Sequence, residues 1–350
     1  MKLGIIGKPQ SGKTTVFNAA SGQQEAVGDF SQAIHRAIIK VPDARVDKLA
    51  EMISPKKITY AEIEFLDAPG FSGKGKESTE LEISSDLRQM DALMVVLNGF
   101  SADANPKADL TDIIDEMILA DQVMIESNIE KRAKKVRTTS DKSAAVEIDL
   151  LKKCQAHLEE EKLLIDIDIT DDEKKSLRGY MFMTQKPLLV VINIAEESIA
   201  TADEKMKLFD DFVSANKREA TVLCGKIEME LVTLEDDDRA MFMEELGIKS
   251  PAVDLVVQKS YNLLGLISYI TAGEPEVRAW TIKKGTVAQK AAGVIHSDIE
   301  RGFIRAEVIK YDDYVELGSE KAVKAAGKFR LEGKEYTVGD GDVILFRFNV

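Results

Sequence analysis

Cysteine and histidine are scarce in this sequence of 350 residues. There are two cysteines, Cys154 and Cys224, and three histidines, His35, His157 and His296. The cysteines stand seventy residues apart without a partner motif, which argues against a disulfide scaffold and against a zinc cluster. Apolar residues make up 44% of the chain, enough to bury a core without covalent staples. We therefore expect a globular, multidomain protein of the reducing cytoplasm.

Long apolar runs are missing as well. The longest, residues 92–97 and 187–192, fall far short of the roughly 20 apolar residues that a membrane helix requires. Residues 1–6 lead directly into a glycine loop, and we interpret them as a first strand rather than a signal peptide. These features predict no contact with a membrane.

Positive charge is in deficit over most of the chain. The formal net charge is −14, and residues 1–266 supply all of it with 34 basic and 48 acidic side chains. Residues 267–350 carry 13 of each sign. Non-specific attraction of the whole chain to nucleic acid is therefore disfavoured, and we predict no DNA specificity. The neutral C-terminal part is the first place to seek an anionic partner, although on charge alone an ordinary mixed surface is the simpler explanation.

Four apolar segments have the character of buried strands, namely residues 3–7, 61–66, 92–97 and 188–192. Each ends at or just before a glycine, aspartate or asparagine, and the first is followed by a loop and a helical segment. Continuous apolar runs bounded by polar turns are typical of a parallel sheet covered on both faces. In such sheets ligands bind at the carboxyl ends of the strands, where these polar residues fall. The pattern predicts an α/β domain.

Between the third and fourth predicted strands lies a long helical interruption. Apolar residues recur there at helical spacing in two segments, separated by the polar stretch 137–143. This pattern predicts an antiparallel, coiled-coil-like hairpin that either binds a partner or serves as a solvated strut. The predicted seam consists of Ile118, Ile125, Ile129 and Val136 in the first helix and Ala144, Ile148, Leu151 and Leu158 in the second.

From residue 267 onward the chain changes character. Apolar and polar residues alternate there, as they do in half-exposed strands, and we predict a small α+β domain. Its predicted strands are residues 277–282, 303–309, 336–338 and 343–348. The predicted domains are an α/β domain from residues 1–117 and 184–266, a helical coiled-coil insertion over 118–183, and a C-terminal domain over 267–350.

The strongest motif is G-x-x-x-x-G-K-[ST], which residues 7–14 match at every fixed position. Its glycines let successive backbone N–H groups point at phosphates, and the following helix adds positive potential. In this motif the lysine, Lys13, reaches the β- and γ-phosphates and the hydroxyl of Thr14 ligates Mg²⁺. The motif therefore predicts a nucleoside triphosphate site. Its expected contacts are Gly7, Gln10, Ser11, Gly12, Lys13, Thr14 and Thr15.

A second motif, D-x-x-G, follows the predicted strand at 61–66. Asp67 is predicted to hold Mg²⁺ through water, and the Gly70 amide to sense the γ-phosphate. Phe71 occupies the position where signalling GTPases carry a glutamine that orients the attacking water. Because phenylalanine cannot orient water, hydrolysis must rely on another group or a partner, or be slow.

Base selectivity is expected at residues 193–196, where GTPases carry N-K-x-D. Here Ile194 replaces the lysine that covers the base, and the longer Glu196 does not reproduce the geometry of the aspartate. The amide of Asn193 matches the acceptor–donor pair at N7 and N6 of adenine. These residues favour ATP over GTP, and Cys224 and Gly225 are predicted to form the last loop beside the base.

Together these residues resemble the YchF group of Obg-like P-loop proteins, a branch of the translation-factor class. The resemblance covers essentially the whole chain and is densest in the C-terminal segments 271–273, 276–285, 291–296, 302–308 and 341–350. It implies a P-loop G domain with an inserted coiled-coil hairpin and a C-terminal TGS-like domain. The activity implied is Mg²⁺-dependent ATP hydrolysis, and the implied partners are ribosomes or ribosomal RNA, reached through the TGS-like domain and the coiled coil.

The sequence departs from the family pattern at the catalytic positions. Gln10 stands where the family usually has an asparagine linked to monovalent-cation use, and Ser31 falls where a Mg²⁺-binding threonine is expected. The family's candidate catalytic histidine follows the strand that ends here at Leu97, but residues 98–110 contain no histidine. Two functions therefore stay open: a slow ATPase switch, and a binding module that ATP gates without being hydrolysed. A small-molecule kinase explains neither residues 193–196 nor the C-terminal domain.

Overall fold

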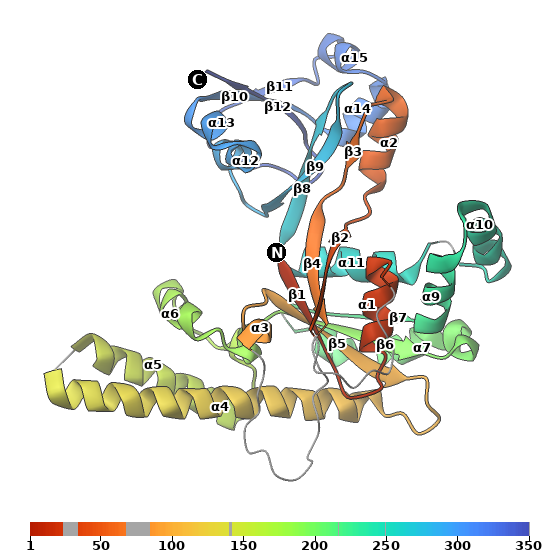
Figure 1. Cartoon of the computed structure of the whole chain (residues 1–350). Helices are drawn as coiled ribbons and strands as arrows, with labels where there is room; N and C mark the ends of the chain where they lie inside the picture. Colours follow the sequence, from red (N-terminus) through yellow and green to blue (C-terminus); the bar gives the residue numbers. More distant parts are fainter. Residues whose placement is uncertain (24–33, 68–84, 140–141, 216, 249, 350) are drawn as a thin grey trace. The chain divides into compact units, whose positions relative to one another are not determined.

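The computed structural model describes residues 1–23, 34–67, 85–139, 142–215, 217–248 and 250–349 (Figure 1). These residues form two compact units. The first comprises Met1–Ala37 and Glu64–Val256, and the second Ile38–Ile63 and Val257–Val350. This division differs from the predicted one, because residues 38–63 group with the C-terminal unit and the helical hairpin groups with the first unit.

The first unit is built on a sheet with the strand order β2-β4-β1-β5-β6-β7. The predicted strands are present, and β1 pairs in parallel with both β4 and β5, as β6 does with β5 and β7. Every residue of β6 is buried, as expected for a strand covered on both faces. The strands are β1 (Lys2–Ile6), β2 (His35–Lys40), β4 (Glu62–Asp67), β5 (Ala92–Gly99), β6 (Leu188–Ile194) and β7 (Arg218–Leu223).

Strands β2 and β7 are absent from the sequence prediction. Both interleave charged and apolar residues, so neither forms the continuous apolar run by which a buried strand is recognised. They lie at the two edges of the sheet, where one side of a strand faces no neighbour.

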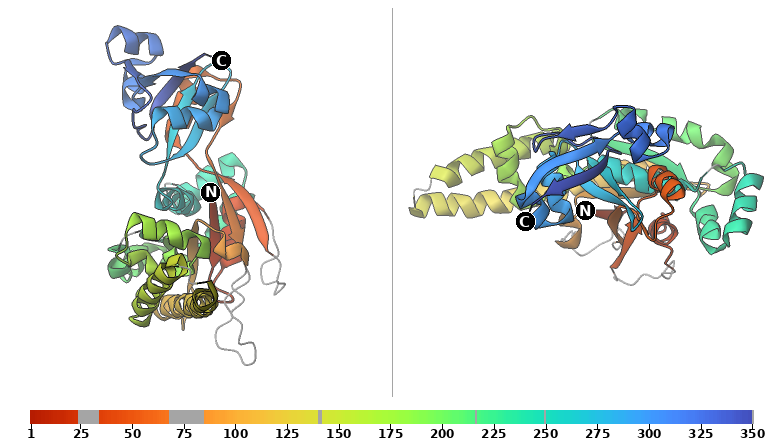
Figure 2. Two further views of the ribbon diagram at one scale, coloured as in Figure 1. Left: turned by 90° about the vertical axis from the view of Figure 1, so that its left-hand side faces the viewer. Right: turned by 90° about the horizontal axis from the view of Figure 1, so that it is seen from above.

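The hairpin of the first unit consists of α4 (Pro106–Thr139) and α5 (Lys142–Glu159), which run side by side (Figures 1 and 2). Helix α4 begins well before the predicted start at residue 118, with proline at its first position and Asn105 accepting from the Ala108 N–H. The predicted seam is confirmed in part: Ile118, Ile125, Ala144, Leu151 and Leu158 are buried, whereas Ile129, Val136 and Ile148 are half-buried.

Shorter helices complete the first unit. They are α1 (Lys13–Ser21), α3 (Ser85–Arg88), α6 (Asp171–Leu177), α7 (Ala202–Lys207), α8 (Asp210–Val213), α9 (Gly225–Thr233), α10 (Asp236–Glu245) and α11 (Ala252–Leu263), the last of which continues into the second unit. Single 3₁₀ turns occur at η1 (Leu164–Asp166), η2 (Arg178–Tyr180) and η3 (Met183–Gln185), and a longer one at η4 (Glu196–Thr201).

The second unit has a mixed sheet with the strand order β11-β10-β12-β8-β9-β3. Residues 38–63 belong to it because β3 (Ile58–Thr59) pairs in parallel with β9, and α2 (Ala44–Ile53) packs on β8 and β9. The other strands are β8 (Leu266–Ala272), β9 (Val277–Lys283), β10 (Phe303–Ile309), β11 (Arg330–Glu332) and β12 (Val343–Phe348), with helices α12 (Ala288–Ile295), α13 (Ser297–Arg301), α14 (Tyr311–Leu317) and α15 (Glu320–Ala325).

One predicted strand of this unit is wrong. Residues 336–338 form only an isolated bridge, between Thr337 and Val287. The alternation of apolar and polar residues in this segment therefore does not come from strand pairing. Val338 is buried in the core, and the hydroxyl of Tyr336 donates to the buried carboxylate of Asp342 over 2.7 Å. Among the described residues of the whole chain, no helix is long and apolar enough to cross a membrane.

Candidate nucleotide-binding site

The loop at residues 7–14 connects β1 to α1, as the motif predicts. Gly12 has φ +94°, and a Cβ atom there would lie 2.1 Å from the side-chain nitrogen of Asn193. A Cβ atom on Gly7 would lie 2.4 Å from the carbonyl oxygen of Val96. Both positions therefore require glycine, because the loop curls directly against the ends of the neighbouring strands β5 and β6.

The lysine of the motif lies inside the curl of this loop. The Lys13 side chain donates to the carbonyl oxygens of Gly7 at 3.1 Å and Lys8 at 3.0 Å, and the residue is only 8% exposed. Burial lowers the pKa of Lys13, and the negative charge of Asp67 partly opposes that change. An ammonium group has three N–H donors, so one remains for an anion arriving at the N-terminus of α1.

Two side-chain oxygen groups that could coordinate a metal ion lie beside this lysine. The hydroxyl of Thr14 donates to Asp67 Oδ2 over 2.9 Å, and Asp67 is 3% exposed at the carboxyl end of β4. A small number of oxygen ligands of this kind suits Mg²⁺, which keeps several water molecules in its coordination shell and completes that shell with phosphates of the substrate. Among the residues that the structure describes, no group of three or more histidine, cysteine or acidic side chains could hold a metal. The predicted partners Ser31 and Gly70, and also Phe71, lie outside the described residues.

Asn193 ties two loops of the site together. Its side-chain nitrogen donates to the carbonyl oxygen of Ser11 over 3.2 Å, and its oxygen accepts from the Gly225 N–H over 2.9 Å. The residue is 6% exposed at the end of β6. Its amide oxygen and one N–H therefore hold the phosphate loop against the loop at residues 224–225, which leaves one N–H for a base.

The sequence also predicts that Ile194, Glu196, Cys224 and Gly225 lie near the base. Ile194 is buried. The carboxylate of Glu196 accepts from Lys226 over 3.0 Å, and both side chains are largely exposed. The thiol of Cys224 is buried, and burial raises its pKa. A Cβ atom on Gly225 would lie 3.0 Å from the methyl group of Thr15, so α1 approaches this loop closely.

Lys8 is a feature of the site that the sequence did not predict. Its ammonium donates to Asp109 Oδ1 over 2.7 Å and to Asp112 Oδ2 over 2.5 Å, both in the first turns of α4. These hydrogen bonds raise the pKa of Lys8. The partners stand more than 100 residues away along the chain, so no local pattern marks the pairing.

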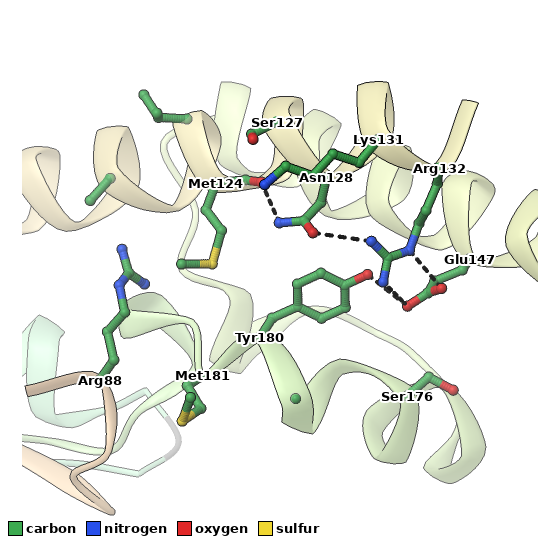
Figure 3. Close-up of a pocket in the computed structure, with 13 residues that line it drawn as sticks. Arg88, Met124, Ser127, Asn128, Lys131, Arg132, Glu147, Ser176, Tyr180 and Met181 are labelled. Carbon is green, nitrogen blue, oxygen red and sulfur yellow. Dashed lines mark hydrogen bonds and ion pairs between the residues drawn. The ribbon is translucent and has the colours of Figure 1, made fainter. Parts of the chain in front are cut away.

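A separate cleft of about 740 Å³ lies between α4, α5 and η2 (Figure 3). Figure 3 shows Arg88 at one end of it and Arg132 at the other, with Met124 and Tyr180 between them. Arg132 and the hydroxyl of Tyr180 both donate to Glu147 Oε1, at 2.8 and 2.6 Å. No lining residue belongs to the phosphate loop, and the network joins the two hairpin helices to the segment after α6.

The fold and this loop define a P-loop nucleotide-binding protein with a separate α+β unit. Residues 2–131 match a family model described as "50S ribosome-binding GTPase". Residues 266–349 match the YchF-GTPase C-terminal model, described as a protein of unknown function.

Full-length relatives place the chain more narrowly. It is 41% identical to the "Ribosome-binding ATPase YchF" of Bacillus subtilis over 366 aligned positions, with 100% of both chains covered. It is 36% identical to the protein of that name from Escherichia coli O157:H7, covering 100% of this chain and 99% of the relative. The solved structure of the Schizosaccharomyces pombe YchF GTPase superposes with a TM-score of 0.82 at 27% identity, covering 99% and 97%. This chain belongs to the YchF family.

Proposed function

We propose that this protein binds ATP with Mg²⁺, hydrolyses it slowly, and uses the nucleotide as a switch on a ribosomal partner. The observation that carries the proposal is the set of Lys13, Thr14 and Asp67 at the N-terminus of α1, in which Lys13 and Asp67 are buried and Thr14 is half-buried. It places one cation and two oxygen ligands where a phosphate chain meets a helix N-terminus. When bound, Mg²⁺ neutralises charge on the phosphates, and Thr14 and Asp67 are the residues that would hold it.

Two observations support ATP over GTP. The lysine that covers the base in GTPases is replaced here by Ile194, whose side chain is buried. The Glu196 carboxylate is already paired with Lys226, whereas guanine needs an unengaged carboxylate for its N1–H and its exocyclic amine. The name "ATPase" carried by the bacterial relatives agrees with this choice.

The ribosomal partner is proposed from the relatives' names and from the surface of the second unit. "Ribosome-binding" stands in the names of both bacterial relatives. Lys283, Lys284 and Arg305 are exposed cations of the second unit, as is Arg301, which pairs with Asp298. Exposed cations of this kind contact phosphates of RNA in a salt-dependent way. We assign this contact to the TGS-like domain, assisted by the hairpin.

A binding module gated by ATP without hydrolysis is the second candidate. Residues 98–110 contain no histidine, and position 71 is phenylalanine. Of the histidines, His157 contacts the carbonyl oxygen of Leu163, His296 caps α13, and His35 at the start of β2 has its ring centroid 6.3 Å from that of Phe17 on α1. None of the three belongs to the phosphate loop.

The test is calorimetric titration with ATP, GTP and ADP in the presence of Mg²⁺, followed by phosphate release with and without ribosomes. Preferential ATP binding with release stimulated by ribosomes supports the switch ATPase. ATP binding without release in either condition supports the gated module. A preference for GTP contradicts the assignment of the base site, and binding of none of the three overturns the nucleotide site itself.

A further inference from the structure

We propose that Lys8 is a positioning residue that couples the phosphate loop to α4, so that nucleotide binding loosens the attachment of the hairpin. The inference rests on the nucleotide binding proposed above. Its basis is that the two halves of Lys8 have different partners. The carbonyl oxygen accepts from Lys13 over 3.0 Å, whereas the ammonium donates to Asp109 and Asp112 on α4.

The face of α4 that meets Lys8 is acidic. Asp109, Asp112 and Glu116 follow one another at helical spacing, so they lie on one side of the helix. Burial and the charge of Asp112 raise the pKa of Glu116, whereas Lys8 lowers it, which shows that all three carboxylates share the field of this lysine. The ammonium of Lys8 is therefore the group that makes an acidic helix face compatible with this side of the phosphate loop.

A bound triphosphate acts on this contact with a definite sign. It brings negative charge to the loop, where it attracts the Lys8 ammonium and repels the carboxylates of Asp109 and Asp112. The nucleotide then interacts differently with the attached and released forms of α4, which is the condition for a ligand to shift such an equilibrium. ATP weakens the attachment more than ADP, because it carries the additional phosphate charge.

Apolar residues between positions 110 and 118 pack α4 into the core, and the middle of the helix is fixed at the carboxylate of Asp121. This carboxylate is fully buried and accepts from the Thr184 N–H and hydroxyl, both at 2.8 Å, and from Arg88 at 3.0 Å. From the 1.5 Å rise per residue, the Lys8 contacts lie about 16 Å from Asp121, and Thr139 lies about 27 Å away on the other side.

The distal part of the hairpin follows α4 because α5 is attached to it. Arg132 on α4 and Glu147 on α5 form an ion pair, and Tyr180 donates to the same carboxylate (Figure 3). A change at the phosphate loop therefore reaches a surface available to a partner through one helix and one ion-paired neighbour.

The test is hydrogen exchange of the α4 amides in the full-length protein, with and without ATP and Mg²⁺. In the wild type we expect ATP to speed exchange over residues 106–121 by about threefold to tenfold, and ADP to have a smaller effect. In Asp109→Asn/Asp112→Asn the ionic contact with Lys8 is absent while Leu110, Ile113 and Met117 still pack in the core, so we expect faster exchange in the first turns of α4 without nucleotide and little further effect of ATP. ATP affinity, measured by calorimetry, stays within about threefold of the wild type because neither aspartate belongs to the phosphate loop.

The matched control is Asp115→Asn/Glu126→Gln, which removes the same charge from exposed positions of α4 and keeps the response. Lys8→Arg retains a cation and is expected to retain the response, whereas Lys8→Met loses it. A wild type that binds ATP without a change in α4, or an Asp109→Asn/Asp112→Asn variant that responds like the wild type, overturns the inference. A wild type that binds no ATP overturns the proposed function, and the coupling with it.

Discussion

The phosphate end and the base end of the candidate site differ in burial. At the phosphate end, Lys13 and Asp67 are 8% and 3% exposed, and their contacts include two backbone carbonyls and the hydroxyl of Thr14. At the base end, the side chains of Glu196 and Lys226 are 46% and 68% exposed and contact each other. Buried polar groups lose much more than exposed ones when a partner is removed. The comparison therefore separates residues on which binding depends from residues that adjust which base is bound.

The same change at the two ends should have very different consequences. Lys13→Ala removes the buried ammonium that we propose contacts the phosphates, and we expect ATP affinity to fall at least about 100-fold. Lys226→Ala, which deletes an exposed ammonium, is the matched control and should change ATP affinity by less than about fivefold. Calorimetric titration of both variants measures the difference. Similar losses in the two variants would remove the distinction between the two ends.

The side chain of Asn193 connects the phosphate loop to the loop at residues 224–225, and we predict that it stabilises the folded protein. Asn193→Ala leaves the Ser11 carbonyl and the Gly225 N–H without their side-chain partner, which costs about 2–4 kcal/mol in the free energy of unfolding. Urea denaturation measures this change. Asn128→Ala is the comparison variant, since the hydrogen bonds that Asn128 makes with described residues, to Met124 and Arg132, lie within α4, and it should cost about 1 kcal/mol or less. If Asn193→Ala lowers the free energy of unfolding no more than Asn128→Ala does, the two hydrogen bonds of Asn193 are unimportant for stability.

The oxygen pair at the phosphate end is expected to set the Mg²⁺ dependence. Thr14→Val removes the hydroxyl that donates to Asp67, so the gain in ATP affinity on adding Mg²⁺ should fall by about tenfold. Thr14→Ser keeps the hydroxyl and should behave like the wild type. ATP titrations with Mg²⁺ and with EDTA give the ratio for each variant. An unchanged ratio in Thr14→Val would mean that the metal is held elsewhere.

The smallest effect is expected in base preference. Lys226→Met frees the carboxylate of Glu196 to accept from guanine, so the ratio of GTP to ATP affinity should rise by about twofold to fivefold. Glu196→Gln is the partner variant and should leave GTP binding weak. Competition titrations with the two nucleotides measure the ratio. A Lys226→Met variant with the wild-type ratio would assign base choice to other groups.

Much of the first unit could be predicted from the sequence, because its signals are local. Strands β1, β5 and β6 contain continuous apolar runs, β4 ends in the apolar pair Phe65 and Leu66, and the seam of the hairpin follows the helical period. Prediction from the hydrophobic pattern failed where the pattern of buried residues did not match that of a buried strand. Strands β2 and β7 mix charged and apolar residues at the sheet edges, and Val338 packs into the core without being part of a strand. The grouping of residues 38–63 with the second unit depends on pairing between β3 and β9, which no local pattern specifies.

By itself the sequence determined the phosphate loop, since the two glycines of the motif supply the close approaches that the loop requires, with φ +94° at Gly12. Only the tertiary structure decided which side chains meet that loop. Asn193 reaches Ser11 from 182 residues away, and Lys8 reaches Asp109 from 101. The physical reason is that such contacts depend on the order of strands in a parallel sheet and on where α4 begins. Both are set by packing of the whole unit, so residues of ordinary local appearance became parts of the site.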